Sequence, residues 1–288
     1  MTRAHQMKMA ALAALVGVAG CTLEDPQQDA GLEGKAGSIA LVQVDRWESP
    51  DQATPHLVAG AKVASFTGIE ATTVEELLGG ATLDADTCSL SSATRGNAAI
   101  GAEAEVALLD VGAIELEAGD LATLLEPRMF PAVGSTAAGV FYAAEGSVTV
   151  PRAEDDEYSL RARGVEGLGS FELVMPAPGT PTEVRVDGYL LDEDATISRD
   201  RDLELTWDAE DLSDVLELEL SSGGEVLTCA CRDDGHLSLS ARYLRGLDAE
   251  EGATLVIRRV RHQQFDMTRV DAAHARVATA RAFTVTIR

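Results

Sequence analysis

Cysteines with an unusual spacing are the residues of this sequence best suited to carry chemistry. Cys229 and Cys231 are separated by one residue in an alternating segment, so on a β-strand both side chains point to the same face. Cys88 or His236 could supply a further ligand for a metal ion. A disulfide from this pair to Cys88 is commoner in an oxidising compartment, and burial of the thiols as small apolar groups competes with it. Three thiols leave at least one without an internal disulfide partner.

Acidic loops are the second group of candidates, because carboxylates bind calcium. Asp208, Asp211 and Asp214 lie close together in the sequence, and Asp233 and Asp234 form another acidic turn. Calcium takes about six to eight oxygen ligands, and these loops lack the alternating spacing and the turn glycine of a single-loop site. We therefore expect solvated turns that do not bind calcium tightly.

Common catalytic motifs are absent from the sequence. No segment matches HExxH, GxSxG, a phosphate-binding P-loop or the dinucleotide-binding GxGxxG pattern. The histidines at 56, 236, 262 and 274 are scattered, and carboxylates are too abundant for their proximity to indicate acid–base chemistry. The sequence predicts a protein that is not an enzyme and needs no metal or cofactor. An enzyme with an unrecognised site remains the alternative.

Cys21 differs from the other cysteines because it follows an export signal. Arg3 and Lys8 precede a short apolar run from Met9 to Ala19, and small residues lead to the cysteine. The run has the length of a secretory signal and is too short for a membrane span. The pattern resembles a bacterial lipobox, so residues 1–20 are expected to be a signal peptide and Cys21 the lipidated first residue of the mature chain.

The residues after Cys21 indicate where the anchored chain resides. Residues 21–37 are polar and without periodicity, so we expect a flexible tether. Thr22 stands where an aspartate holds many lipoproteins at the inner membrane, so we expect the outer membrane. The expected partners are the membrane, reached through the lipid, and other envelope or surface proteins.

Composition excludes several classes of ligand. Removal of Arg3 and Lys8 would change the formal charge from −25 to −27, which repels nucleic acid and anionic membrane surfaces. Only two tryptophans, Trp47 and Trp207, are present, so a broad aromatic platform for sugars is not expected.

Alternating segments place these residues on β-strands in two domains. In the first part, 38–177, such segments include Ser38–Val44, Ala61–Phe66 and Tyr158–Arg163; only Thr73–Leu78 and Asp120–Leu125 resemble helical turns. Prolines at 176, 178 and 181 mark a linker that cannot lie in a central strand.

The second part, 180–288, has about seven strand-like segments, which fits an immunoglobulin-like or fibronectin-type-III-like sandwich. In Val215–Leu220 the leucines at 216, 218 and 220 are expected to face inward, and Glu217 and Glu219 outward. Trp207 is expected in the core. The fold class predicted for the whole chain is all-β, with two β-sandwich-like domains.

Three segments resemble a known group of proteins. Thr196–Trp207, Val226–Leu247 and the glycine-containing strand Ala144–Val150 are similar to the two-domain β-sandwich lipoproteins of the myxobacterial type. That resemblance implies a lipobox, a tether, an N-terminal β domain, a proline linker and a fibronectin-like domain, and it implies no activity. Members of the group carry a paired cysteine near Cys88, whereas the first domain here has Cys88 alone.

Together these features predict a lipid-anchored protein of the cell envelope with a structural or protein-interaction role. A ligand-binding or calcium-binding adhesion module is the first alternative.

Overall fold

Strands make up most of the described chain, which confirms the predicted all-β class. The computed structural model describes residues 36–48, 55–80, 85–92, 104–119, 121–130, 137–144, 148–149, 157–191 and 195–288. The predicted signal peptide, Cys21 and almost all of the tether lie outside these ranges. Residues from Leu32 to Arg288 belong to one compact unit. No helix among the described residues is long and apolar enough to cross a membrane.

Two short helices accompany the strands. In chain order the elements are β1 (Ala36–Glu48), β2 (His56–Thr67), α1 (Ala71–Leu78), β3 (Thr87–Ser92), β4 (Glu105–Leu108), β5 (Ile114–Ala118), β6 (Leu121–Phe130), β7 (Ala137–Ala143), β8 (Val148–Thr149), β9 (Glu157–Ala162), β10 (Phe171–Pro176), β11 (Arg185–Val186), β12 (Tyr189–Leu190), β13 (Thr196–Ile197), β14 (Leu203–Thr206), β15 (Val215–Ser222), β16 (Glu225–Arg232), β17 (His236–Leu239), α2 (Ala241–Leu244), β18 (Glu250–Gln264) and β19 (Ala272–Ile287).

The helical turn predicted at Thr73–Leu78 is present as α1, whereas the turn predicted at Asp120–Leu125 is wrong. Residues from Leu121 onward form β6, which pairs with β5. The error arose because Leu121, Leu124 and Leu125 have a helix-like spacing. In the structure Leu125 enters the core while Leu124 is about half exposed, as alternation on a strand requires.

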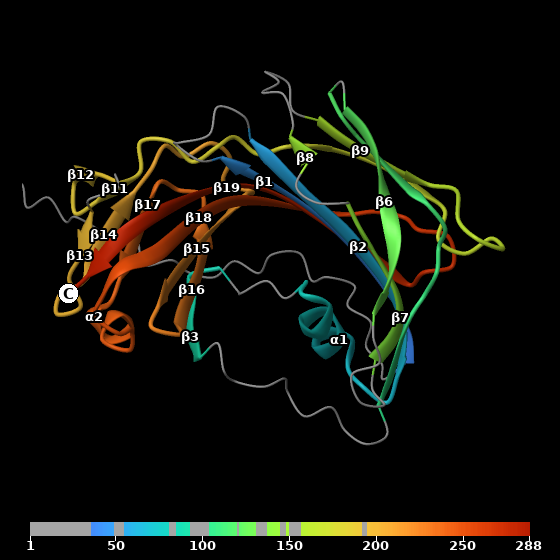
Figure 1. Ribbon diagram of the computed structural model, residues 1–288, viewed down its shortest axis with the longest axis horizontal. Helices are drawn as coiled ribbons and strands as arrows, with labels where there is room; N and C mark the ends of the chain where they lie inside the picture. Colours follow the sequence, from blue (N-terminus) through green and yellow to red (C-terminus); the bar gives the residue numbers. More distant parts are fainter. Residues whose placement is uncertain are drawn as a thin grey trace, which may run out of the picture. The chain divides into compact units, whose positions relative to one another are not determined.

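The strands form two sheets (Figure 1). The larger runs in the order β10-β9-β5-β6-β7-β4-β2-β1-β19-β18-β15-β16-β3, and the smaller in the order β12-β11-β14-β17. At the centre of the larger sheet β1 and β19 are parallel neighbours, from Ile39 opposite Ala272 to Glu48 opposite Arg281. The two central strands therefore come from opposite ends of the described chain.

The sheet crosses the boundary predicted between residues 177 and 180. The β1–β19 pairing joins residues on either side of it, and so does the pairing of β3 with β16. Local alternation shows where strands lie but not which strands pair, so this continuity was not visible in the sequence. The boundary lies between the strands that cover the first part of the sheet (β5, β9 and β10) and the smaller sheet that covers its second part, but the larger sheet itself is continuous across it.

One face of the long strand β19, here called the covered face, carries two hydrophobic cores in succession. Alternate residues share a face. Ala273, Ala275 and Val277 pack into the first core, under β5, β9 and β10. Phe283, Val285 and Ile287 pack into the second, under the smaller sheet. Thr279 lies between the two cores.

The second core is a two-layer sandwich that contains several predicted core residues. Trp207 is only 6% exposed and packs with Leu216, Leu218 and Leu220. Leu203 and Leu205 of β14 come from the smaller sheet, opposite the leucines of β15. The inward positions predicted for the leucines of β15 are confirmed.

The opposite face of the larger sheet, here called the α1 face, is partly covered by α1. Ile39 and Leu41 of β1 pack there against Val74 and Leu78 of the helix. Because Ala40 and Val42 of β1 enter the core on the other face, this part of the strand is buried on both sides. A strand covered on both faces appears in sequence as a continuous apolar run, as it does here.

Candidate functional site

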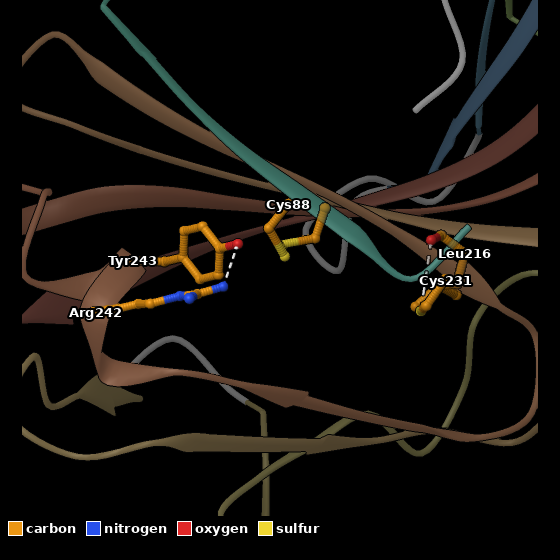
Figure 2. The surroundings of a disulfide bond; sticks show 6 residues. Cys88, Leu216, Cys231, Arg242 and Tyr243 are labelled. Atoms are coloured by element: carbon orange, nitrogen blue, oxygen red, sulfur yellow. Dashed lines mark hydrogen bonds between the residues drawn. A yellow bond between two sulfur atoms is a disulfide. The ribbon is translucent and has the colours of Figure 1, made fainter. Parts of the chain in front are cut away.

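The predicted cysteine candidates form a disulfide (Figure 2). Cys88 of β3 and Cys229 of β16 stand directly opposite each other on antiparallel strands, although 141 residues separate them. Alternation brings both side chains to the second core. A thiolate metal site would need both sulfurs free, so of the interpretations left open by the sequence, the structure contains the disulfide.

Cys231 is the remaining thiol of this group, and it is buried. Its Sγ lies 3.7 Å from the carbonyl oxygen of Leu216, to which the thiol donates. Desolvation raises the pKa of Cys231 to about 12, and Asp234, Asp86 and Asp233 add to the rise. The thiol therefore stays protonated at neutral pH and is a poor nucleophile and metal ligand.

His236 lies apart from the cysteines on the outer side of the smaller sheet. Its Nε2 is 2.6 Å from Glu204 Oε2, and Ser238 Oγ donates to the other oxygen of the same carboxylate, also at 2.6 Å. The side chains of His236 and Glu204 are both exposed at the surface. Because the carboxylate, and not the imidazole, stands in the middle, the histidine is not placed to take a proton from the serine.

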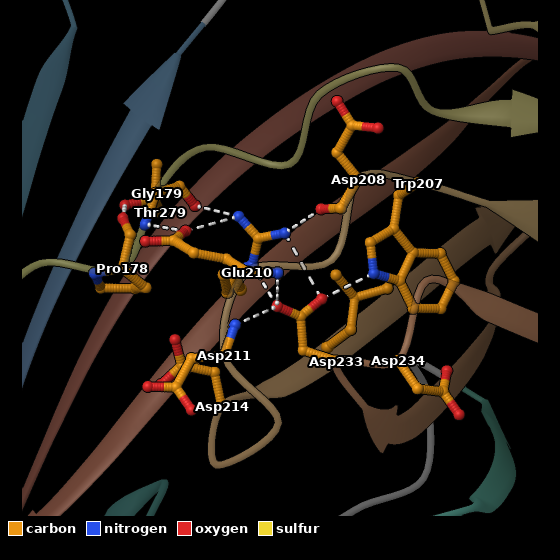
Figure 3. A network of polar contacts seen from close by, with 12 residues as sticks. Pro178, Gly179, Trp207, Asp208, Glu210, Asp211, Asp214, Asp233, Asp234 and Thr279 are labelled. Atoms are coloured by element: carbon orange, nitrogen blue, oxygen red, sulfur yellow. Dashed lines mark hydrogen bonds and ion pairs between the residues drawn. The ribbon is translucent and has the colours of Figure 1, made fainter.

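The acidic candidates do not gather round one point: Asp211 and Asp214 lie beside Arg261, and Asp208 lies apart from them (Figure 3). Asp214 forms a two-pronged ion pair with Arg261, at 2.8 and 2.7 Å. Asp211 accepts hydrogen bonds from the backbone and hydroxyl of Ser213, and Asp208 accepts one from Thr182. Among the described residues no group of three or more histidine, cysteine, aspartate or glutamate side chains could hold a metal ion.

The prediction that all these acidic residues lie in solvated turns is wrong for two of them. Asp214 is 1% exposed and Asp233 is fully buried. A buried carboxylate needs a charged partner. The arginines of β18 supply those partners, which the local sequence around the acidic turns does not reveal.

Arg259 of β18 is the centre of a buried polar network, and Figure 3 labels its neighbours Glu210 and Asp233. Its Nε lies 2.8 Å from Asp233 Oδ2, and its Nη1 lies 2.8 Å from Glu210 Oε2. The indole nitrogen of Trp207 donates to the other oxygen of Asp233 at 2.6 Å. The side chain of Arg259 is only 2% exposed, so this ion pair is shielded from water and salt.

The same network clamps the proline-rich linker onto the sheet. Side chains of β18 and β19 donate hydrogen bonds to backbone carbonyls of the linker. Arg259 donates to Gly179 at 2.9 Å, and Thr279 donates to Pro178 at 2.7 Å. Two longer hydrogen bonds of 3.4 Å run from Arg261 to Pro176 and from Arg281 to Pro181. A proline has no backbone N–H, so its carbonyl is the only main-chain group that can form a hydrogen bond with these side chains. The segment predicted as the domain boundary is therefore held at several points along its length.

A second polar assembly lies on the α1 face, here called the polar row. Its members share one face of four neighbouring strands, and they are Gln43, Asp45 and Trp47 of β1, His274 and Arg276 of β19, Arg258 and His262 of β18, and Glu217 and Glu219 of β15. Arg276 is its centre, with Asp45 Oδ1 and Glu217 Oε2 each 2.7 Å away. Further along, Arg258 binds Glu219 at 3.0 Å and lies over the ring of Trp47, 5.3 Å from its centroid.

A shallow depression lies at one end of the polar row, next to the end of α1. It is lined by Leu41, Val42, Gln43, Gly80, His262, His274, Ala275 and Arg276. Gln43 Nε2 donates to the carbonyl of Gly79 at 2.6 Å, and His274 lies 3.7 Å from Glu75 of the helix. Side chains of the sheet thus fix the helix end that borders the depression.

Burial sets the protonation of this assembly. Desolvation raises the pKa of Asp45 above its usual value, against the opposing effect of Arg276. Desolvation by the crowded strands lowers the pKa of His262, although the residue as a whole is exposed at the surface. Burial therefore favours the neutral forms of both Asp45 and His262, and the charged neighbours of Asp45 oppose that effect.

Glu217 and Glu219 were predicted to face outward, and they do leave the core, but they are not free in solvent. Glu217 is 16% exposed and is tied to Arg276 of a strand two positions away in the sheet. Only the parallel β1–β19 pairing brings Asp45 to the same arginine. The alternation of β15 showed which residues leave the core, but no signal in the sequence showed what they meet.

Comparison with known proteins adds no relative to this description: no protein-family model matches the chain, and no curated protein matches it significantly.

Proposed function

We propose that this chain is a lipid-anchored protein of the bacterial cell envelope that acts by binding and by holding a fixed shape, not by catalysis. The junction around Arg259 is the observation that carries this proposal. The most deeply buried ionic side chains there hold linker carbonyls and each other. Their role is to fix one covering layer against the next, and their positions leave them no access to a substrate.

The Cys88–Cys229 disulfide supports the location. Disulfides persist in the periplasm and at cell surfaces and are rare in the cytosol. This agrees with an export signal ending at Cys21, and with the outer membrane as the site of anchoring. The resemblance to myxobacterial two-domain lipoproteins has the same implication, including a fibronectin-like second domain over 180–288 after a first domain over 38–177.

Replacement of the lipidated residue tests the proposal. In the parent bacterium or a Gram-negative host, the wild-type chain is expected to incorporate labelled palmitate and to enter the detergent phase. Cys21→Ser is expected to lose the label and to partition into the aqueous phase. Cys231→Ser is the matched control and should keep the label. Equal partitioning of the Cys21→Ser and wild-type chains would overturn the anchor.

A further inference from the structure

We propose that the polar row on the α1 face is a binding site for a neutral, hydroxyl-rich ligand, namely an oligosaccharide. This inference rests on the proposed role as a binding module of the envelope and names the ligand class for it. Six residues of the polar row carry the argument, and they are Gln43, Asp45, Trp47, Glu217, Arg258 and Arg276. None of them belongs to the linker junction or to the disulfide.

The row offers donors and acceptors side by side. Asp45 and Glu217 each use one oxygen for Arg276. Within the described part of the chain, the second oxygen of each carboxylate takes no hydrogen bond, and the indole N–H of Trp47 donates none. A carboxylate has about four acceptor sites and a guanidinium about five donors, so each pair keeps capacity for a ligand. A hydroxyl group, which both donates and accepts, matches such alternating partners.

The charges of the row argue against an ionic ligand. Three carboxylates, from Asp45, Glu217 and Glu219, face the two guanidinium groups of Arg258 and Arg276. An anion at Arg276 would lie beside the carboxylates of Asp45 and Glu217, and a cation at either carboxylate would lie beside the guanidinium of Arg276, so either ion would be repelled by a neighbour of its own charge. A ligand without net charge can bind while these ion pairs stay intact.

Trp47 supplies the apolar contact that a sugar ring also needs. Its indole is half-buried, and Arg258 lies 5.3 Å from the ring centroid. The C–H groups of a pyranose form an apolar face that packs on an indole, while its hydroxyls point to the polar edge. Trp47 follows Gln43 by four residues on the same strand, so the row extends about 13 Å along β1.

The row is already ordered before any ligand arrives. Its side chains project from paired strands, and the ion pairs hold Arg276 and Asp45 at 16% and 24% exposure. Binding to such a rigid surface loses little side-chain entropy, which favours affinity for a small ligand. The adjoining depression, next to Gly80 and His262, has a volume of about 30 Å³, which suits water but not a sugar ring, so the ligand would lie along the row itself.

Tryptophan fluorescence of the full-length protein in detergent tests the inference, since the two tryptophans lie on opposite faces of the sheet. Trp207 is buried and bonded to Asp233, so a surface ligand should change the emission of Trp47 alone. The probes are maltotriose, the trisaccharide of N-acetylglucosamine and, as the anionic comparison, the trisaccharide of galacturonic acid. We expect a saturable change with at least one neutral probe and weaker binding of the anionic one.

Two variants, measured by calorimetry, test which residues are involved. Glu217→Gln removes one charged acceptor and is expected to weaken binding of the neutral probe about tenfold. Trp47→Leu is expected to weaken it by at least as much. Glu204→Gln, on the exposed face of the smaller sheet, is the matched control and should bind as the wild type does. Melting temperatures identify any variant that has failed to fold.

The inference is overturned if no neutral probe saturates a Trp47 signal, if the anionic trisaccharide binds more tightly than the neutral ones, or if folded Glu217→Gln and Trp47→Leu both bind as the wild type does. Cys21→Ser should leave the titration unchanged. A failed titration therefore counts against the ligand, whereas absence of palmitate labelling from the wild-type chain counts against the anchor.

Discussion

At the residue scale, this protein buries charges as complete pairs. Arg259 and Asp233 are both excluded from water, and the indole N–H of Trp207 donates to the Asp233 oxygen that is not the one nearest Arg259 Nε. Desolvating such a pair is costly, so its net contribution to stability is small, but removing one partner leaves an unpaired charge in the core.

Arg259→Leu is therefore expected to destabilise the fold by about 3–5 kcal/mol, because Asp233 would stay buried without its partner. Denaturant unfolding followed by circular dichroism measures this change. The control is Arg161→Leu, which breaks an exposed ion pair with Glu172 and should alter the midpoint little. Similar midpoints for the two variants would show that the junction is not a buried ionic centre.

His262 gives the fold a dependence on acid. Desolvation lowers the pKa of His262 below its ordinary value of 6.5, so the unfolded chain takes up a proton at a higher pH than the folded chain. The stability associated with the neutral ring is complete above pH 6.5 and is lost as pH falls through 6.5 towards the folded pKa. Arg276 and His274 strengthen this effect, and Glu217 opposes it.

His262→Gln, which cannot titrate, is expected to lose less stability than the wild type between pH 7.5 and pH 5. Urea unfolding of both chains at the two pH values measures the difference. An equal loss in the two chains would mean that His262 does not contribute to the acid dependence.

At the element scale, the disulfide fixes an edge strand that has few other contacts. None of the residues of β3 is fully buried, and only Cys88 and Leu90 pack against the second core. Although β3 belongs to the first half of the sequence, it pairs with β16 of the second half, at the edge of the sheet. The cross-link closes a long loop, which lowers the entropy of the unfolded chain.

Cys88→Ser is expected to lower the free energy of unfolding by about 4–5 kcal/mol, given the 141-residue separation of the two cysteines. The backbone amides of β3 should also exchange with solvent faster, as hydrogen–deuterium exchange would detect. Cys231→Ala keeps the disulfide and serves as the control for removing a buried sulfur. Unchanged protection of β3 in Cys88→Ser would show that strand pairing alone holds it.

The sequence was informative about single elements and less so about their partners. Alternation placed Leu216, Leu218 and Leu220 in the core, and the local pattern located α1. The parallel pairing of β1 with β19 and the ion pairs of Arg259 depend on residues far apart in the chain. No local periodicity specifies such pairing, so the linker junction and the polar row could not be predicted.

At the scale of the whole molecule, the larger sheet, with strands from β1 to β19, joins two hydrophobic cores into one compact unit. The linker between the covering strands is held by Arg259 and Thr279. A chain built in this way should unfold in one transition, because separation of the cores would expose the edge of β19 and break the clamp.

Residues 180–288 expressed alone are therefore expected to fold less stably than the same residues in the full chain. They lack β1, the parallel partner of β19, and Cys88, the disulfide partner of Cys229. Calorimetry of the full chain and of the fragment tests this expectation. Two separate transitions in the full chain, one of them matching the fragment, would indicate independent domains.

Peptide-resolved mass spectrometry of the protein extracted from bacterial membranes tests the lipid anchor and the disulfide in one measurement. We expect a first residue at Cys21 that carries diacylglyceryl and acyl groups, a cross-linked pair of peptides containing Cys88 and Cys229, and Cys231 as the free thiol. A chain that keeps residues 1–20 and carries no lipid, with Cys88 and Cys229 both reduced, would contradict this expectation.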